Sequence, residues 1–541
     1  MSYKNICLPL LLLCGIHSLI AQSKRDHTWI LGYPTLIPGQ PNTEQFGGMF
    51  MKFSEDQYTV ENFDIVGGPV SAVANDEDGN LLFYTNGCSI YNSAHEVMEN
   101  GSDINMGAAD YDYVCYQTLG ISYIRSGNVV LPKPGSNDVC YLFHLRFIET
   151  SDTSGLNDAL LFTEVDMGEN NGTGKVILKN QIAVADSLHD ALAVCRHGNG
   201  RDWWIVIPRG INRDFWKILF SPEGIKETTL QSFPPPYPPF TVQYEFPIDE
   251  PPYVRYFSPD EYEFESWAGQ AIFSPDGTKY CRVIRAGVIE IYDFDRCSGE
   301  MALRRTIPLP PYIAYPEIPV TACGLAVSPN SRYLYFNNNE ALYQFDMCPE
   351  HLENGNFELI QEWDRFLQDS FFATNFFQMR NAPDGKIYMA AANSVRSLHV
   401  IHEPDKPGKA CRFEQRGVDL PRYTNWVINY FPNFNLYDLA DSPCDTLGID
   451  DPNPPKPTYT FETLRIFPNP ASREVTLFVP QCDAIRVKVW NIAGQLVEDI
   501  PFVPGMEAYP LDVSGWASGA YIIAAYIDAQ KPVMQKIIVA H

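Results

Sequence analysis

The stretch FSPDGTKYCRVIRAGVIEIYDFD, residues 273–295, has the pattern of two β-strands joined by tight turns. A Pro-Asp-Gly turn leads into a first strand, Arg-Ala-Gly forms a hairpin, and a second strand ends on aromatic residues. Residues 327–346, VSPNSRYLYFNNNEALYQFD, and residues 381–401, NAPDGKIYMAAANSVRSLHVI, repeat the pattern. The turn positions Gly277, Ser331 and Gly385 are 54 residues apart in each step. A constant period with this content is typical of β-propeller blades.

Weaker copies of the pattern lie upstream, at residues 75–92, 136–145 and 197–220, so six repeats are recognisable. A seventh is predicted where residues 46–63 pair with residues 425–439, because a propeller seals its ring by sharing one blade between the two chain ends. The sequence therefore predicts an all-β fold in which residues 27–440 form a propeller of seven blades, with six or eight as alternatives.

A second, smaller β unit is predicted at the end of the chain. Residues 441–464 are rich in Pro and Asp and have no apolar period, which indicates a semi-extended linker. In residues 465–541, every second position from 475 to 479 and from 485 to 489 is Val, Leu or Ile. Such alternation gives each strand one buried face, so we expect a small antiparallel β-sandwich.

Composition excludes one class of partner. The chain has 541 residues, 45% of them hydrophobic, and a net charge of −27 from 39 basic and 66 acidic side chains. This charge repels a phosphate backbone, and no Lys/Arg-rich stretch offsets it locally. Nucleic acid is therefore not an expected partner.

The first 21 residues have the layout of a secretory signal peptide. Lys4 precedes an apolar run from Ile6, and the small residue Ala21 marks the expected cleavage site. A lipoprotein anchored at Cys14 is disfavoured, because Leu13 stands where a lipobox needs a small residue. No other apolar run is long enough to span a bilayer, so the sequence predicts an exported, soluble mature protein without a transmembrane segment.

The cysteines do not dictate a disulfide framework. Eleven of the 13 lie after the predicted signal peptide, widely spaced and without a C-x-x-C motif. This spacing favours several buried free thiols together with a few disulfides.

No local motif of an enzyme is present. In GWASG, residues 515–519, the serine comes one position too late for a nucleophile elbow. HEVME at His95 lacks the second histidine of a zinc-binding helix. His399 and His402 are three apart on a predicted strand, so they point to opposite faces and cannot share a metal ion.

Candidate carboxylates have simpler explanations as turns. NDEDGN, residues 75–80, lacks the EF-hand ligands, because Ala74 and Thr85 stand at the first and last positions of such a loop. We expect a turn held by Asp side chains instead. Asp293 and Asp295 face the same side of a strand, as a glycosidase pair would, yet they fall at a strand end where a turn favours Asp. No catalytic residue and no metal ligand is predicted from these patterns.

Residues 232–267 interrupt the repeats with prolines, ten Phe/Tyr residues and a cluster of acids around a single basic residue, Arg255. Insertions on a rigid ring often carry recognition. Exposed tyrosines can stack on sugars or contact a protein, and the acids can hold calcium. The candidate ligand-binding residues are Tyr237, Tyr244, Tyr253 and Tyr256. The alternative is a proline-stiffened loop that packs on neighbouring blades and has no other role.

The repeats resemble two groups of known propellers. SPDGTKY and APDGKIYMA are similar to the Pro-Asp-Gly turns of TolB-like and Trp-Asp-repeat propellers. GNLLFYTNGCSIYNSAHEVMENG, YDFDRCSGE and NYFPNFN look like segments of exported propeller proteins of Bacteroidetes-type bacteria. This resemblance covers most of residues 27–440, and it implies an architecture rather than a reaction.

Four motifs occur in order within about residues 462–541: RIFPNPAS from Arg465, NIAGQLV from Asn491, LDVSGWASGAYII from Leu511 and KIIV from Lys536. Together they closely resemble the type A C-terminal sorting domain of the type IX secretion system. Phe467 departs from the tyrosine often seen there. The residues that carry the resemblance are Pro468, Asn469, Pro470, Gly494, Gly515, Gly519, Tyr521 and Lys536.

The resemblance implies export across the inner and outer membranes to the cell surface or the medium. It also implies two partners, the type IX machinery and a sortase-like peptidase that removes the tail. The sequence as a whole favours a non-enzymatic propeller that works in binding, adhesion or as a scaffold, with a glycan or protein ligand and no cofactor except an optional calcium ion. Two alternatives stay open: a polysaccharide-degrading enzyme with acids converging on the propeller channel, and a structural part of a surface or gliding apparatus.

Overall fold

The computed structural model describes residues 22–33, 45–54, 57–64, 72–108, 115, 127–151, 154–210, 213–234, 240–244, 253–257, 270–284, 288–310, 324–348, 356–424, 426–439, 442–447, 465–467, 469–478, 486–501, 508–526 and 533–541. The predicted signal peptide, most of the predicted linker, Tyr237 and Pro468 lie outside these residues. Within them the chain is almost entirely β, with short 3-10 turns η3 (Asn170–Gly172) and η5 (Gly408–Cys411). The all-β prediction is confirmed.

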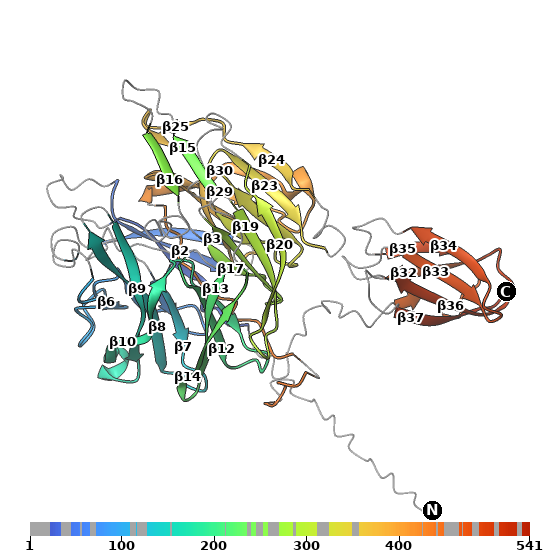
Figure 1. Ribbon diagram of the computed structural model, residues 1–541, viewed down its shortest axis with the longest axis horizontal. Coiled ribbons are helices and arrows are strands. Elements are labelled where there is room, and N and C mark those ends of the chain that lie inside the picture. Colours follow the sequence, from blue (N-terminus) through green and yellow to red (C-terminus); the bar gives the residue numbers. More distant parts are fainter. Residues whose placement is uncertain are drawn as a thin grey trace, which may run out of the picture.

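Seven antiparallel sheets of three or four strands follow one another between residues 28 and 424 of the described chain (Figure 1). The first three are β1 (Thr28–Gly32), β2 (Gly48–Ser54) and β3 (Gln57–Phe63); β4 (Ala72–Asn75), β5 (Leu81–Thr85) and β6 (Ile90–Asn92); and β7 (Val129–Pro132), β8 (Val139–Ser151), β9 (Ser154–Asp166) and β10 (Lys175–Leu188).

The other four sheets each have four strands: β11 (Ala193–Arg196), β12 (Trp203–Pro208), β13 (Asp214–Ser221) and β14 (Gly224–Ser232); β17 (Ala271–Phe273), β18 (Lys279–Ile284), β19 (Val288–Phe294) and β20 (Met301–Pro308); β21 (Leu325–Val327), β22 (Tyr333–Asn337), β23 (Ala341–Asp346) and β24 (Glu358–Glu362); and β27 (Phe376–Asn381), β28 (Ile387–Ala391), β29 (Val395–Ile401) and β30 (Phe413–Thr424). Two hairpins, β15 (Phe240–Tyr244) with β16 (Tyr253–Phe257) and β25 (Leu367–Gln368) with β26 (Phe372–Ala373), lie between sheets in the sequence.

The turn between the first two strands is built in the same way in six sheets, and these are the six repeats predicted from the sequence. In the clearest repeat, the Gly277 amide donates to the Ser274 carbonyl at 2.8 Å, and the Ser274 amide donates to Lys279 at 2.9 Å. Gly277 has φ 72°, a conformation that glycine adopts without strain. The other five turns begin at Asp76, Lys133, His197, Ser328 and Ala382.

The first strands of successive sheets lie against one another: β4 against β7, β11 against β17, β17 against β21, and β21 against β27. Each meander then runs outward from this inner strand, as in a β-propeller. The described sheets between residues 28 and 424 are therefore propeller-like, as predicted. The number of blades stays a prediction, because several connecting segments lie outside the described residues.

The two ends of the propeller segment meet in a different way from the one predicted. The β1–β3 sheet packs on the last sheet through Trp29 and Tyr388, and on the β4–β6 sheet through Ile30 and Tyr84. The predicted pairing of residues 46–63 with residues 425–439 is wrong, since β2 pairs with β1 and β3.

Residues 426–439 lie beside β1 without forming a strand in the described chain. The Ile30 amide donates at 2.7 Å to the side-chain Oδ1 of Asn429, where a strand would offer a backbone carbonyl. Pro432 has no amide hydrogen, so it cannot donate to a ladder.

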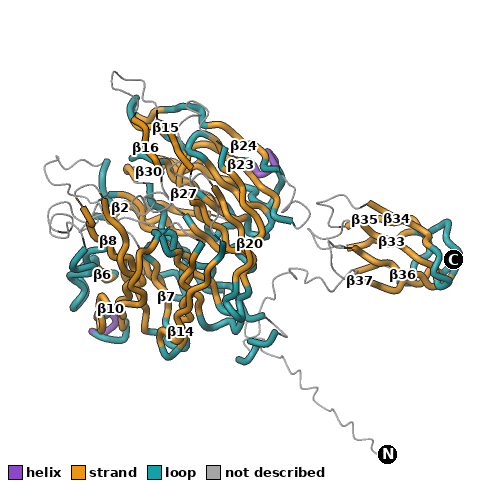
Figure 2. Tube along the Cα trace, viewed as in Figure 1, coloured by secondary structure: helices purple, strands orange, loops and turns teal. Residues whose placement is uncertain are grey.

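The C-terminal strands form a small sandwich in a body of their own (Figure 2). One sheet contains β31 (Arg465–Phe467), β32 (Glu474–Phe478) and β35 (Ala508–Asp512). The other runs in the order β34 (Leu496–Pro501), β33 (Arg486–Asn491), β36 (Gly519–Tyr526) and β37 (Val533–Val539). The predicted alternation is confirmed at Val475, Leu477, Val487 and Val489, which are all buried in the core between the sheets. In the described part of the chain, no helix has the length and apolar character to cross a membrane.

Candidate functional sites: the axial strap and the sorting motifs

The segment that follows the last strand, residues 426–439, is called the strap here. It crosses the inner strands of the ring rather than joining a sheet. Ile428 packs with the β1 and β28 sheets, and Phe434 packs with β11 and β12. Leu436 contacts the cluster formed by β11–β13 and β17–β20. The strap therefore connects sheets that are far apart in the sequence.

Tyr430 is the strap residue that spans the inner strands. Its hydroxyl accepts a hydrogen bond from the amide of Val194 in β11 at 2.9 Å. On another side, the guanidinium of Arg380 in β27 lies 5.2 Å from the ring centroid, close enough for a cation–π contact. Burial raises the pKa of the Tyr430 hydroxyl to about 12 and lowers the pKa of Arg380 to about 10. Since the β17 and β21 sheets separate β11 from β27, Tyr430 lies between inner strands of the ring.

Backbone carbonyls fix the rest of the strap. Phe434 accepts a hydrogen bond from Arg196 Nη2 at 2.9 Å, and the Arg196 guanidinium lies 3.8 Å from the Trp203 ring centroid. The Leu439 amide donates to Gly198 at 2.7 Å. These bonds use backbone atoms of the strap, so no sequence motif announces them.

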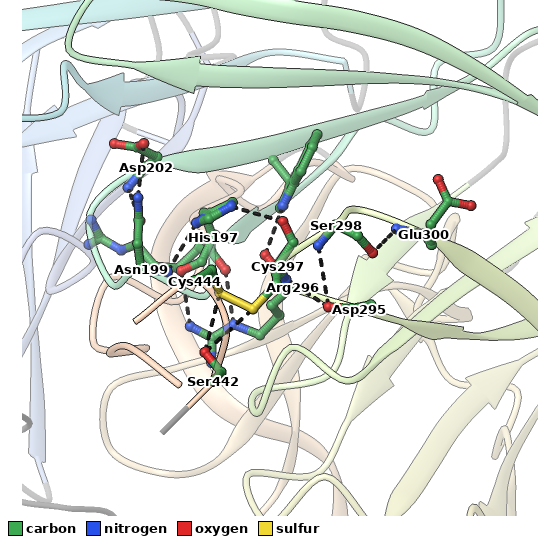
Figure 3. The surroundings of a disulfide bond; sticks show 12 residues. His197, Asn199, Asp202, Asp295, Arg296, Cys297, Ser298, Glu300, Ser442 and Cys444 are labelled. Carbon is green, nitrogen blue, oxygen red and sulfur yellow. Dashed lines mark hydrogen bonds between the residues drawn. A yellow bond between two sulfur atoms is a disulfide. The ribbon is translucent and has the colours of Figure 1, made fainter. Parts of the chain in front are cut away.

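A disulfide just beyond the strap holds the chain to the ring (Figure 3). Cys444 is bonded to Cys297, 147 positions earlier, in the turn after β19. Asp295 Oδ1 accepts the Cys297 amide at 2.8 Å, and the Cys297 carbonyl lies 3.0 Å from His197 Nε2. Burial lowers the pKa of His197. The segment that leads to the tail is therefore covalently linked, at its start, with the β17–β20 sheet.

The predicted mixture of free and bridged cysteines is confirmed. Cys88 is bonded to Cys115, and Cys348 is also disulfide-bonded. The free thiols are all buried; they are Cys140, Cys195, Cys281 and Cys411 among the described residues.

The structure confirms the turn interpretation for Asp76 and Asp295, whereas Asp293 lies within β19. Asp76 Oδ1 accepts the amides of Asp78 at 2.9 Å and Asn80 at 2.8 Å. Asp293 binds Lys279 Nζ at 3.0 Å and also Arg304, whereas Asp295 holds the turn at Cys297.

The two histidines of HVIH are also kept apart. His399 is buried, and its Nδ1 accepts the Arg416 amide at 3.1 Å. His402 lies nearer the surface, with Nε2 2.8 Å from Glu414. Across the parts of the chain that the structure describes, no group of three His, Cys, Asp or Glu side chains is arranged to hold a metal ion.

One buried acid has the surroundings of a catalytic residue, and sequence reasoning did not select it. Glu290 in β19 is fully buried, and its Oε2 lies 2.8 Å from Arg282 Nε and accepts the Tyr292 hydroxyl at 2.7 Å. Its Oε1 lies 2.5 Å from Arg213 Nε. Burial raises the pKa of Glu290, but Arg282, Tyr292 and Arg213 outweigh burial and hold it below its ordinary value. Both oxygens are therefore engaged, and the cluster is a structural ion pair rather than a free acid.

The candidate tyrosines fall on the β15–β16 hairpin as far as the structure describes them. Tyr244 pairs with Tyr253, and Tyr256 pairs with Thr241. The hairpin brings two of the four candidates together, while Tyr237 lies outside the described residues.

The sorting motifs meet at the β37 edge of the sandwich. The Asn469 side chain donates from Nδ2 to the Lys536 carbonyl at 3.0 Å and accepts the Ile538 amide at Oδ1 at 2.9 Å. Beside it, the Ala471 amide donates to the Ile538 carbonyl at 2.9 Å. The segment containing Asn469 and Pro470 therefore covers the backbone edge of the terminal strand.

The third motif lies on the other side of β37. The Tyr521 hydroxyl donates to the Ala517 carbonyl at 2.7 Å, and its ring lies 4.8 Å from the Trp516 ring. His541 Nε2 lies 2.8 Å from the Trp516 carbonyl. Gly519 pairs with Val539, so the turn that contains Gly515 is tied to the chain end.

The remaining motif forms the predicted hairpin turn. Gly494, with φ 77°, donates its amide to the Asn491 carbonyl at 3.0 Å between β33 and β34. Four segments that are separated in the sequence thus form one compact module.

The fold and this module define a propeller protein with a secretion tail. Residues 465–540 match the family described as "Secretion system C-terminal sorting domain". The tail is thus a type IX C-terminal sorting domain, which directs the chain to the cell surface or the extracellular space.

The solved structures that resemble the chain include a periplasmic gluconolactonase from Pseudomonas aeruginosa, with 12% identity, 75% of this chain and 99% of that chain covered, and a TM-score of 0.32. Apo AztD from Citrobacter koseri has 11% identity, coverage of 74% and 97%, and a TM-score of 0.33. The β-propeller domain of Cps50 (Swd1) from Myceliophteria thermophila has 8% identity, coverage of 68% and 93%, and a TM-score of 0.30. Similarity this low carries no inference about activity. No curated protein matches the chain.

Proposed function

We propose that the protein is an exported, non-enzymatic propeller that acts in binding or adhesion, or as a scaffold, at the cell surface or in the medium. The observation that carries the proposal is the position of Tyr430 between β11 and β27. An enzyme with its site in the channel needs free acids converging there, whereas this chain places its own strap among the inner strands.

The paired charges support the same proposal. The carboxylate of Glu290 is engaged by Arg213 and Arg282, and the Asp293 carboxylate binds Lys279. A general acid must instead keep a proton to give to a substrate. These paired carboxylates therefore favour a rigid platform over a hydrolase.

The described surface offers an aromatic contact site on the β25–β26 hairpin. Phe371 is 78% exposed and Phe366 is 47% exposed. The Arg416 guanidinium lies 4.6 Å from the Phe366 ring centroid, and Arg416 also pairs with Asp364. Exposed aromatic rings of this kind suit sugar rings or a protein surface. Together with the tyrosines of β15 and β16, they are the proposed ligand-binding region.

The proposal also concerns the removal of the tail and the binding of calcium. The type IX machinery delivers the chain, and a sortase-like peptidase then removes the tail. The binding role requires no cofactor, and calcium bound by the acids of residues 232–267 is an optional addition.

The test uses the exported protein, with its melting temperature measured against a panel of polysaccharides and against calcium. A ligand that binds the folded state raises the melting temperature by mass action. The same samples are assayed for released sugar. A shift without product supports a glycan binder, and no shift with any polysaccharide favours a protein ligand or an envelope scaffold. Released sugar would overturn the non-enzymatic proposal and favour a polysaccharide-degrading enzyme.

A pair of variants locates the binding region. Phe371→Ser should abolish the shift, because it removes the most exposed aromatic ring of the hairpin. Ile177→Ser is the matched control, since Ile177 is also exposed, at 43%, but lies on β10 in another sheet.

A further inference from the structure

One end of the outer face of the four-stranded sheet in the tail is apolar and exposed, whereas Arg486, Lys488 and Asp499 lie farther along the same face. Leu496 is 51% exposed, Ile522 is 42% exposed and Met534 is 63% exposed. In the register of the sheet, Trp490 pairs with both Leu496 and Ile522, and Ile522 pairs with Lys536. One row of side chains therefore crosses all four strands. A solvated sheet face normally carries polar residues, so this composition calls for a partner.

The sorting motifs converge on this face. NIAGQLV contributes Leu496 and also Ile492, which is 83% exposed in the turn next to it. LDVSGWASGAYII contributes Ile522, and KIIV begins with Lys536. These side chains are not part of the sandwich core, which is formed by other residues such as Val487 and Ile537. The face formed by Trp490, Ile492, Leu496, Ile522, Met534 and Lys536 is called the sorting face below.

The edge of the neighbouring strand β37 is not free to bind a partner. Asn469 and Ala471 engage the backbone of β37 at Lys536 and Ile538, where an added strand would have to bind. A partner cannot extend the sheet at those residues without displacing this segment. The sorting face, in contrast, is accessible as it stands.

Charge also separates the tail from the rest of the chain. Residues 465–541 contain six basic and seven acidic side chains, whereas the whole chain has a net charge of −27. On the same side of the sheet as the sorting face, Arg486 Nη2 lies 3.1 Å from Asp499 Oδ2, so these two charges are paired with each other. The tail is therefore suited to apolar docking, and the acidic ring is suited to remain in water.

We propose that the sorting face is the surface by which the tail docks on an apolar surface of the type IX secretion machinery. The proposal rests on the sorting role of the tail, and it is independent of what the propeller binds. The partner contacts the face of the sheet and does not add a strand to the β37 edge.

The test compares export of full-length variants in a bacterium with a type IX system. Ile492→Asp and Ile522→Asp place a charge on the sorting face, and each should lower the amount at the surface and in the medium by about tenfold or more, with accumulation in the periplasm. Arg473→Asp is the matched control, because Arg473 is exposed next to β32 in the other sheet, and its export should equal that of the original chain.

The melting temperature of each purified variant shows whether it folds. Ile492 lies in an exposed turn, so Ile492→Asp should keep the original melting temperature and remains informative even if Ile522→Asp does not fold. Normal export of folded Ile492→Asp and Ile522→Asp would overturn the proposal.

Two further measurements separate the alternatives. A chain that ends at residue 464 should be retained in the periplasm, and its export would refute the sorting role itself rather than the choice of face. Sedimentation reports the oligomeric state. A dimer that Ile492→Asp converts to a monomer without any loss of export would assign the face to a second copy and overturn docking on the machinery.

Discussion

The hydroxyl of Tyr430 accepts the amide hydrogen of Val194 at 2.9 Å, across 236 positions of the chain. One atom of the strap thus satisfies a backbone donor of an inner strand in the middle of the ring. A buried donor that loses its acceptor destabilises a protein more than the net value of the hydrogen bond suggests, because its contact with water is not restored.

Tyr430→Phe should lower the free energy of unfolding of the propeller by about 1 to 3 kcal/mol, because the Val194 amide loses its acceptor. Tyr84→Phe is the matched control. The Tyr84 hydroxyl is buried and has no hydrogen-bond partner among the described residues, so its removal should be neutral or stabilising. Chemical denaturation of both variants measures the difference, and equal effects would contradict the role of the strap.

Cys444→Ser should lower the free energy of unfolding by about 2 to 5 kcal/mol, because a cross-link between residues 147 positions apart restricts the unfolded chain strongly. The strap should also become accessible to proteases in this variant. Limited proteolysis with mass spectrometry identifies cuts between residues 426 and 447. Cys411→Ser, at a buried free thiol, is the control and should leave that segment protected. Protection of the strap in Cys444→Ser would show that the noncovalent contacts suffice.

Stability should fall as the pH falls below about 6.5, because of buried histidines. Burial, with a smaller contribution from Arg416, lowers the pKa of His399 to about 3 from its ordinary 6.5. The unfolded chain therefore takes up the proton first, so the stabilisation is complete above pH 6.5 and is lost progressively toward pH 3. Between pH 8 and pH 5, this residue should account for a loss of roughly 2 kcal/mol.

His399→Gln should reduce that pH dependence, whereas Tyr84→Phe should keep it, since no group that titrates in this range is changed. Denaturation curves at pH 8 and pH 5 give the comparison. His144 and His189, whose pKa values burial also lowers to about 3, should contribute in the same sense. An unchanged pH dependence in His399→Gln would contradict its being neutral when folded.

Asn469→Ala should expose the edge of the terminal strand. Its side chain covers the Ile538 amide and the Lys536 carbonyl, so hydrogen exchange at the Ile538 amide should become faster. Asn469→Asp keeps the acceptor for Ile538 and loses the donor for Lys536, so its effect should be smaller. Hydrogen–deuterium exchange with mass spectrometry of residues 533–541 measures both. Equal protection in the three proteins would show that Ala471 alone holds this edge.

The local sequence was sufficient to predict the strands and turns of the repeats and the β-sandwich of the tail. The Pro-Asp-Gly turn at Gly277 and its copies predicted the turns between first and second strands, because a positive φ and short turn bonds are local requirements. The alternation at Val475 and Leu477 predicted a buried sheet face for the same reason. Asp76 was correctly interpreted as a turn residue, since its side chain accepts the nearby amides of Asp78 and Asn80.

The contacts of the strap could not be predicted in this way. The segment around Asn429 was expected to form a strand, and instead its side chain takes the place of a strand carbonyl beside Ile30. The Cys297–Cys444 pairing and the engagement of Glu290 by Arg213 likewise join distant positions. No spacing rule connects such residues, because their partners are set by packing.

The sequence by itself determined the repeats of the propeller, the sandwich and its sorting motifs, since each depends on turn chemistry and apolar alternation within a few dozen residues. Only the tertiary structure decided that Tyr430 lies between inner strands, that Cys444 is bonded to Cys297, and that three sorting motifs share one exposed face. These features depend on how the sheets pack in three dimensions, and burial, unlike backbone conformation, is a property of the folded chain as a whole.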